Sequence, residues 1–318
     1  MQKKMIDIIE ECKGAGSIGI SGHLRPDGDC VGSCLGMYLY LKKNCPAETV
    51  IDVILEPFSN DFNCIKGAED RRDYPRRQPY DVFICLDCDE ERLGDSRPGF
   101  DKAKKTINID HHVSNQSNAD VKIVEPEAAA ASELVFLTMD KDKMDVDIAM
   151  ALYVGIINDT GVLQYSNASP RTHRIVADLL EFGFDHSKFI DETFYEKSYI
   201  QNQILGRALT ESMLVLDKKV IAAAIDRKIM NFYGVTGKDM DGIVSQLRYT
   251  RGVEVAILMY ELESQKWKVS LRSNGKVNVA EVAEFFDGGG HVRASGCTLL
   301  GDYRDVINNL CDRIALQL

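Results

Sequence analysis

The sequence lacks the features of membrane and secreted proteins. No apolar stretch approaches the length needed to span a bilayer, and Asp7, Glu10 and Glu11 interrupt the apolar residues near the N-terminus, so no signal-peptide core is present. Nine cysteines, an odd number without a secretory signal, are expected to be reduced thiols. These absences predict a cytoplasmic protein that has no membrane partner.

The sequence also lacks an excess of positive charge. It has 38 Lys and Arg against 49 Asp and Glu, which gives a formal net charge of −11. Because non-specific nucleic-acid affinity comes mainly from basic surfaces, this balance argues against binding a long duplex. A small anionic ligand remains compatible if cations are concentrated at one site. No low-complexity tract and no fixed-period repeat is present, so a globular fold is expected.

A chain of 318 residues exceeds the length at which one core usually keeps growing, so two domains are expected. The first half alternates short β-rich apolar runs with longer helical patterns, which predicts an α/β fold with a parallel sheet and helices on both faces. Residues 1–190 are expected to form this domain, 191–211 a helical linker, and 212–318 a smaller α/β domain. The active-site cleft is expected between the two domains.

Polar residues follow three of the four strands predicted in the first half. These strands are 17–21, 50–55, 82–86 and 106–109, and the helices predicted around them are 30–43, 132–139, 147–157 and 171–181. The first strand leads into His23, the third into Asp87, and the fourth into Asp110. Since ligands of open α/β sheets bind at the carboxyl ends of the strands, these residues mark the expected site.

His23, Asp27 and Asp29 lie in one loop between the first strand and the first long helix. Their H-x3-D-x-D spacing, with Pro26 and Gly28 inside, makes a tight turn that can aim three metal ligands at one region. The alternative is an Asp-rich turn whose only role is to cap the helix that follows. The loop alone does not decide between these interpretations.

Asp110, His111 and His112 form a second cluster directly after an apolar run. Adjacent side chains on an extended chain point in opposite directions, so one histidine can bind a metal while the other faces a substrate. A pair of surface histidines is the alternative. Asp87 and Asp159 are single carboxylates, and a lone Asp at such a position is usually a helix cap or a turn residue.

Taken together, these four motifs resemble, in order and spacing, the motifs of the DHH phosphoesterase superfamily over roughly residues 15 to 167. The second half adds Ser270-Leu271-Arg272-Ser273 and Gly288-Gly289-Gly290-His291, which resemble the substrate-binding segments of the DHH-associated C-terminal domain. The resemblance therefore covers nearly the whole chain.

The resemblance implies two divalent metal ions that share one carboxylate. His23, Asp27 and Asp87 would hold one ion, and Asp29, Asp87, His111 and Asp159 the other. Oxygen and imidazole ligands suit Mn²⁺, with Mg²⁺ or Co²⁺ as alternatives, better than thiolate-seeking metals. Such ions lower the pKa of a shared water, so that hydroxide forms near neutrality and can attack a phosphoryl group.

The resemblance also assigns roles around the metals. His112 would contact the phosphoryl group, and Asp110 would orient the neighbouring histidines. In the second domain, glycines let backbone N–H groups approach a phosphate, while Arg272 can clamp it with two hydrogen bonds. The expected substrate-binding residues are Arg272, Ser273, Gly288, Gly289, Gly290 and His291. A helix stop is the alternative explanation of the glycine run.

Chain length and the glycine-rich segment are most similar to the oligoribonuclease and 3′-phosphoadenosine 5′-phosphate phosphatase branch of the superfamily. The expected partners are short single-stranded oligonucleotides or small nucleotides, and a homodimer is possible. One alternative is a phosphodiesterase acting on cyclic or linear di-adenylates. Another is a catalytically silent nucleotide-binding protein that keeps the fold.

Overall fold

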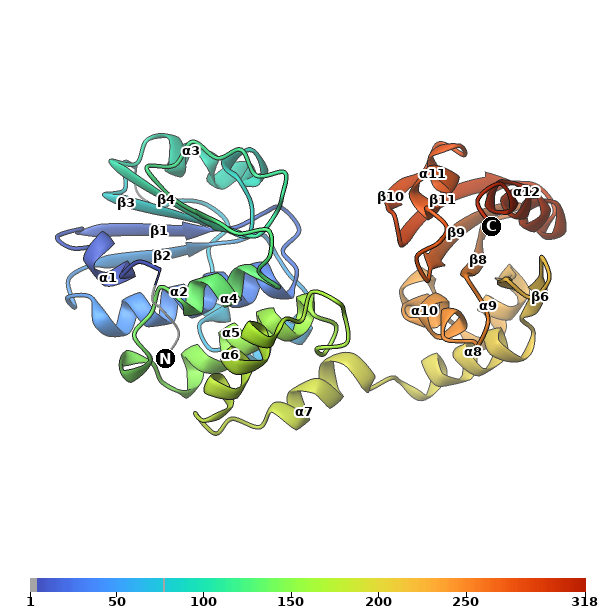
Figure 1. Cartoon of the computed structure of the whole chain (residues 1–318), viewed down its shortest axis with the longest axis horizontal. Helices are drawn as coiled ribbons and strands as arrows, with labels where there is room; N and C mark the ends of the chain where they lie inside the picture. The colour runs from blue at the N-terminus through green and yellow to red at the C-terminus, as the bar shows by residue number, and fades with distance from the viewer. Residues whose placement is uncertain (1–4, 77) are drawn as a thin grey trace. The chain divides into compact units, whose positions relative to one another are not determined.

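The structure of this chain is a computed structural model that describes residues 5–76 and 78–318. Two compact units are present, one ending at Tyr195 and the other beginning at Glu196 (Figure 1). The first contains a parallel sheet with helices and the second a separate mixed sheet, which confirms the predicted α/β class. Among the described helices, none combines the length and apolar character that a membrane crossing requires.

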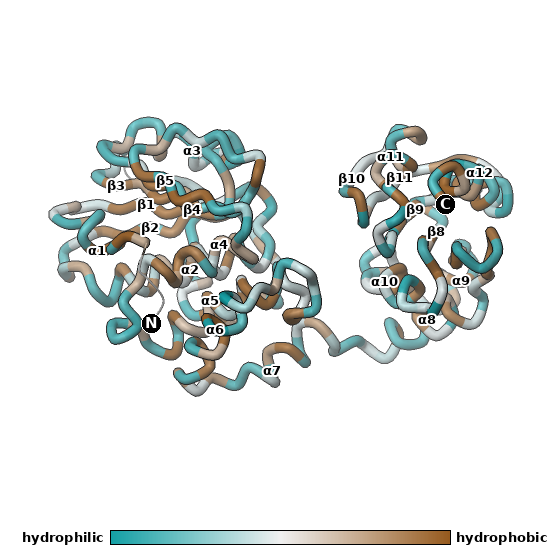
Figure 2. Tube along the Cα trace, viewed as in Figure 1, coloured by the Kyte–Doolittle hydropathy of each residue, from teal (hydrophilic) through white to brown (hydrophobic). Residues whose placement is uncertain are grey.

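The sheet of the first unit has five parallel strands in the order β2-β1-β3-β4-β5. Both β1 and β3 are buried along their whole length, as expected of strands covered on both faces. Figure 2 shows apolar residues gathered along these strands. The strands are β1 (Ser17–Ser21), β2 (Val50–Ile54), β3 (Val82–Leu86), β4 (Lys105–Asp110) and β5 (Val121–Val124).

Helices cover the two faces of this sheet unequally. The larger apolar core lies against α2, α4, α5 and α6, while a smaller cluster around Phe83 and Phe100 packs under α3 (Figure 1). The helices are α1 (Ile8–Glu11), α2 (Gly28–Asn44), α3 (Arg97–Asp101), α4 (Ala131–Phe136), α5 (Val146–Asp159), α6 (Pro170–Leu180) and α7 (His186–Ile190). A π-helical turn, Asp191–Tyr195, then closes the unit.

The second unit has a six-stranded sheet in the order β10-β11-β9-β8-β7-β6. Only the β7–β8 pair is parallel, so the sheet is mixed. The strands are β6 (Met213–Val215), β7 (Val220–Ile225), β8 (Val255–Glu263), β9 (Lys266–Ser273), β10 (Gly289–His291) and β11 (Ala294–Leu300).

Two apolar cores lie on opposite faces of this second sheet. One is formed with α11 (Val279–Glu284) and α12 (Tyr303–Ala315). The other is formed with α8 (Tyr199–Thr210), α9 (Arg227–Tyr233) and α10 (Ile243–Arg248), and it involves residues of β7 and β8. Helix α8 and the π-helical turn before it lie within the segment expected to be a linker.

Candidate metal centre

The strand order of the first unit places the site. The chain runs from β1 outward to β2 and then crosses back to β3 on the other side of β1, so the carboxyl ends of β1 and β3 form a switch point. Loops leaving a switch point diverge and leave room for a ligand. His23 follows β1 and Asp87 follows β3, and the Nε2 atom of His23 lies 3.3 Å from Oδ2 of Asp87.

The His23 ring is oriented by its own loop. Its Nδ1 atom lies 2.9 Å from the carbonyl oxygen of Leu24, which fixes the proton on Nδ1 and turns Nε2 toward Asp27 and Asp87. Burial opposes a positive charge on His23, but interactions with these two carboxylates outweigh burial and raise its pKa to about 11. A divalent cation could replace that proton.

Asp27 and Asp29 point in different directions. Asp27 is the N-cap of α2 and accepts hydrogen bonds of 3.1 Å from the backbone amides of Asp29 and Cys30. Asp29 is fully buried and accepts hydrogen bonds from the amides of Ala131 and Ser132 at the start of α4. The helix-capping interpretation is therefore correct for Asp27, yet its Oδ1 also lies 3.7 Å from Nε2 of His23.

His111 extends the cluster from the end of β4. Its Nδ1 atom lies 3.3 Å from the carbonyl oxygen of Ala128, so Nε2 faces the carboxylates, as in His23. The distances from Nε2 are 3.3 Å to Asp159, 3.4 Å to Asp87 and 3.9 Å to Asp29. Burial opposes charge on this ring, while the three carboxylates raise its pKa to about 10.

Asp87 lies between the two imidazoles and is 2% exposed. Its backbone has φ of 59°, an uncommon left-handed conformation for a residue other than glycine. Among the described residues, none forms a hydrogen bond with the buried Oδ1 atom of Asp87. Buried carboxylate oxygens normally have partners, so this atom fits a bound cation.

The excess of negative charge at the site raises the pKa of two further carboxyl groups. Burial and the neighbouring charge of Asp87 raise the pKa of Asp29 to about 7. Burial and the charges of Asp29, Asp87 and Asp27 raise the pKa of Asp159, the last residue of α5, to about 9. Carboxylates that are crowded and desolvated in this way favour a proton or a cation, which suits a divalent metal.

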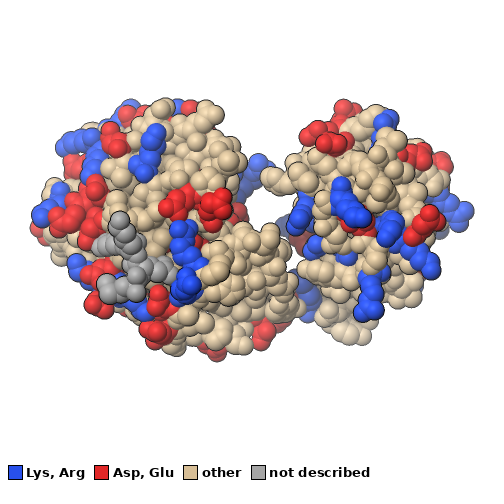
Figure 3. Space-filling model, viewed as in Figure 1, with Lys and Arg blue, Asp and Glu red and all other residues tan. Residues whose placement is uncertain are grey.

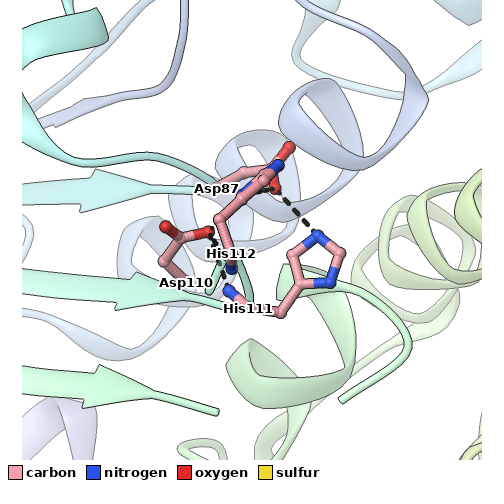
Figure 4. A group of neighbouring side chains, drawn as sticks. All are labelled: Asp87, Asp110, His111 and His112. Carbon is pink, nitrogen blue, oxygen red and sulfur yellow. Dashed lines mark hydrogen bonds and ion pairs between the residues drawn. The ribbon is translucent and has the colours of Figure 1, made fainter. Parts of the chain in front are cut away.

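Asp110 and His112 lie directly beside Asp87 and His111 (Figure 4), and Nδ1 of His112 is 3.7 Å from Oδ1 of Asp87. Oδ1 of Asp110 accepts hydrogen bonds from the amides of both histidines and lies 2.7 Å from Nδ1 of His112. Oδ2 accepts a bond of 2.6 Å from Asn115. The hydrogen bond to Asp110 raises the pKa of His112 despite burial. The His112 side chain is 38% exposed, so a ligand can reach it.

The sequence interpretation missed two residues of this region. Asn115 lies five residues beyond Asp110, and no local pattern marks it as a partner of that carboxylate. Cys30 lies close enough to His23 and Asp87 for all three to hold one ion. Burial raises the pKa of Cys30 well above its ordinary value, which keeps the thiol neutral and disfavours it as a ligand beside oxygen donors.

The structure brings together most of the residues predicted in the second unit. Arg272 on β9 is aligned with Ala294 on β11, which is aligned with His291 on β10. Ser273 is the exception. Its side chain is buried on the opposite face of β9 and its Oγ lies 3.1 Å from Glu254. A substrate on the Arg272 face cannot reach the Ser273 hydroxyl.

Packing explains two of the three glycines. A Cβ atom on Gly288 would lie 2.4 Å from the carbonyl oxygen of Gly296, and one on Gly290 would lie 2.5 Å from that of Ala294. Gly290 also has φ of 147°. A Cβ on Gly289 would meet nothing within 4 Å. The run is therefore an edge strand packed closely on β11, with its middle residue open.

Comparison with known proteins agrees with this geometry. The model of the DHH family, N-terminal domain, matches residues 17–156, and that of the DHHA1 domain matches residues 217–316. The chain is 30% identical over 298 residues to the bifunctional oligoribonuclease and PAP phosphatase NrnA of Thermus thermophilus, covering 90% of this chain and 85% of the relative. It is 24% identical to the protein of the same name from Bacillus subtilis, covering 87% of each.

A solved structure also matches nearly the whole chain. It is that of an exopolyphosphatase-related protein from Bacteroides fragilis, with a TM-score of 0.83 and 25% sequence identity. The match covers 97% of this chain and 94% of that one. Both units therefore have counterparts in a single known protein.

Proposed function

Because this chain belongs to the DHH family and hydrolyses phosphoester bonds, we propose that its substrates are short single-stranded oligonucleotides and 3′-phosphoadenosine 5′-phosphate. The relatives that carry oligoribonuclease and PAP phosphatase in their names support this substrate class. The observation that carries the proposal is the buried Asp87 carboxylate between two imidazoles. Its Oδ2 lies 3.3 Å from Nε2 of His23, and its Oδ1, which accepts no hydrogen bond from the described residues, lies 3.4 Å from Nε2 of His111.

In this proposal, six side chains hold two divalent ions. Asp87 would bridge them, with His23 and Asp27 on one side and Asp29, His111 and Asp159 on the other. Two such ions, Mn²⁺ by preference, would supply a nucleophile at neutral pH and offset the charge of the phosphoryl oxygens. The carbonyl oxygens of Leu24 and Ala128 keep both imidazoles in the tautomer that metal binding requires.

His112 would act on the substrate itself. Asp110 orients the ring through Nδ1, which leaves Nε2 free to contact a phosphoryl oxygen. Since Asp110 raises the pKa of His112, the ring tends to carry a proton that it can donate in a hydrogen bond. Asp110 is a positioning residue in this scheme.

In the second unit, Arg272, His291 and the open backbone at Gly289 would bind the nucleotide. The register of β9, β11 and β10 aligns Arg272 with Ala294 and Ala294 with His291, which supports a shared position for the guanidinium and the imidazole on one side of the sheet. Gly288 and Gly290 would support this surface by packing on β11. Ser273 is not included, because its hydroxyl faces Glu254.

The first experiment measures release of phosphate and mononucleotide in the presence of Mn²⁺. The substrates are 3′-phosphoadenosine 5′-phosphate, ribonucleotides of two to five residues, and cyclic di-adenylate. Asp110→Ala/His111→Ala serves as the inactive variant, and His173→Ala, which removes an exposed histidine of α6, serves as its matched control. We expect hydrolysis of the first two substrate types, reduced more than about a hundredfold in the inactive variant.

The other outcomes contradict the proposal in different ways. Dominant cleavage of cyclic di-adenylate would assign the protein to dinucleotide turnover. Binding of nucleotide without metal-dependent hydrolysis of any substrate would identify a silent nucleotide-binding protein. Equal loss of activity in His173→Ala would show that the assay reports general damage rather than the metal centre.

A further inference from the structure

One face of β9 is only partly covered by the helices of the second unit, and we call it the open face. Its side chains alternate between buried and half-buried positions along the whole strand. The buried set faces α11 and α12 and contributes Trp267, Val269 and Leu271 to that core. The half-buried set, on the other face, consists of Lys266, Lys268, Ser270 and Arg272.

The neighbouring strand β11 continues this open face with small side chains. Lys268 is aligned with Thr298, and Ser270 with Gly296. Thr298 is exposed and Gly296 is half-buried, so neither covers the longer side chains beside it. On the other side of β9, Ala256 and Leu258 of β8 belong to the core under α8, α9 and α10. The apolar core on this face therefore ends at β8.

The open face is cationic. Lys266 pairs with Glu263 at 3.2 Å, but within the described residues no carboxylate forms an ion pair with Lys268. The second unit as a whole is nearly neutral, because residues 196–318 contain 16 Lys and Arg against 15 Asp and Glu. The first 195 residues contain 22 against 34, a net charge of −12. Figure 3 shows both Lys and Arg and Asp and Glu side chains on the visible face of the second unit.

We propose that the open face of β9 binds the backbone of a single-stranded oligonucleotide, with Lys268 contacting a phosphate beyond the nucleotide held at Arg272. This inference rests on the proposed function and specifies how the protein would recognise substrate length. Lys268 and Arg272 are four residues apart on one strand face, which separates their Cα atoms by about 13 Å. That distance exceeds the spacing of adjacent phosphates, so only a substrate of three or more nucleotides reaches Lys268.

Three kinds of contact make an oligonucleotide the fitting occupant. Lys268 offers a charge for a phosphate, and the Ser270 and Thr298 hydroxyls offer hydrogen bonds to phosphate or sugar oxygens. Their spacing along the strand follows a linear chain rather than a compact anion. None of these groups reads a base, so the surface would select length and not sequence.

The test compares substrates of two and five nucleotides with the variants Lys268→Gln and Thr298→Asp. Thr298→Asp keeps the lysine and places a carboxylate beside it. Arg304→Gln, on α12 against the opposite face of the sheet, removes one charge as a matched control. With Mn²⁺, we expect each test variant to raise KM for the pentanucleotide about fivefold. KM for 3′-phosphoadenosine 5′-phosphate and the dinucleotide should stay within about twofold.

A binding measurement separates this inference from the proposed function. Anisotropy of a labelled penta-adenylate with the full-length protein in chelator requires no turnover. Lys268→Gln should weaken binding, and the slope of log affinity against log salt should fall by about 0.7 for one lost phosphate contact. Binding with this dependence but no hydrolysis would refute the proposed function alone. Equal effects on two and five nucleotides, equal effects of Arg304→Gln, or no effect would overturn the extended site.

Discussion

Asp110 is a buried carboxylate with several hydrogen-bond partners. Its carboxylate is fully buried and satisfies two backbone amides, the His112 ring and Asn115 at once. Burial opposes its negative charge, but the hydrogen bonds from His112 and Asn115 hold its pKa below the ordinary value. Asp110 therefore stays ionised. Its negative charge holds the His112 ring in place and favours the protonated form of that ring.

Asp110→Asn should lower activity about 10- to 100-fold, as is typical for partners of active-site histidines. Loss of the negative charge lowers the pKa of His112, so activity that depends on a protonated ring should decline at lower pH than in the wild type. The pH–rate profile at saturating Mn²⁺ measures this shift. Asn115→Ala, which removes a neutral partner of the same carboxylate, should move the profile less. An unchanged profile in Asp110→Asn would contradict the role given to His112.

Which residue types belong to the site could be predicted from the sequence, but their contacts could not. His23, Asp87 and His111 could be singled out because each lies within two residues of the end of a predicted strand of a parallel sheet. The burial of Ser273 could not be predicted, because the alternation along β9, which turns it toward Glu254, depends on which face of the strand is covered. Asn115 carried no signal at all.

The contact between α2 and α5 positions two of the candidate ligands. Gly32 on α2 lies so close to α5 that a Cβ atom would be 2.5 Å from the carbonyl oxygen of Ala151 and 2.7 Å from the amide nitrogen of Gly155. These are backbone atoms that cannot move aside independently. Since Asp27 caps α2 and Asp159 ends α5, the spacing of the two helices affects the distance between them.

Gly32→Ala should force these helices apart and destabilise the protein by about 1 to 3 kcal/mol. The same shift should weaken Mn²⁺ binding. Urea denaturation and titration calorimetry measure the two effects. Gly206→Ala is the control, because a Cβ at that position of α8 would meet nothing within 4 Å. It should be neutral or stabilise by up to about 1 kcal/mol. Equal stability of the two variants would disprove the close-packing argument.

Several strands and helices of the first unit could be predicted because apolar residues recur along them with the spacing of a strand or a helix. Strands 17–21 and 82–86 match β1 and β3, and helix 30–43 matches most of α2. Strand β5 was missed, since four residues at the edge of a sheet bury too little to leave a pattern. The short helices α9 and α10 were missed for a similar reason, because tertiary packing stabilises them more than their own sequence does.

The two units carry very different charge, and the carboxylates of the candidate metal centre account for part of the difference. In the metal-free protein, Asp29, Asp159, His23 and His111 all have pKa values above their ordinary ones. The folded state therefore binds protons that the unfolded state has released, from the ordinary carboxyl value of 3.8 upward. For all four groups, stability of the metal-free protein should fall as pH rises.

Mn²⁺ should stabilise the protein more at about pH 8.5 than at about pH 6, because binding displaces these protons and competes with them less at high pH. Calorimetric melting with and without Mn²⁺ at both pH values gives the difference in Tm. Titrations in buffers of different ionisation enthalpy should also detect proton release on binding. His111→Ala is expected to reduce both effects. A pH-independent Mn²⁺ stabilisation would argue against protonated ligands in the metal-free site.

All six candidate metal ligands lie within the first 159 residues of the chain, and all belong to the first compact unit. Domains generally fold as units during translation, beginning with the N-terminal one. The first unit could thus fold and acquire its ions while residues 196–318 are still being added by the ribosome. If manganese is the ion, nascent chains of this protein would compete for it before they carry the surface proposed to bind nucleotides.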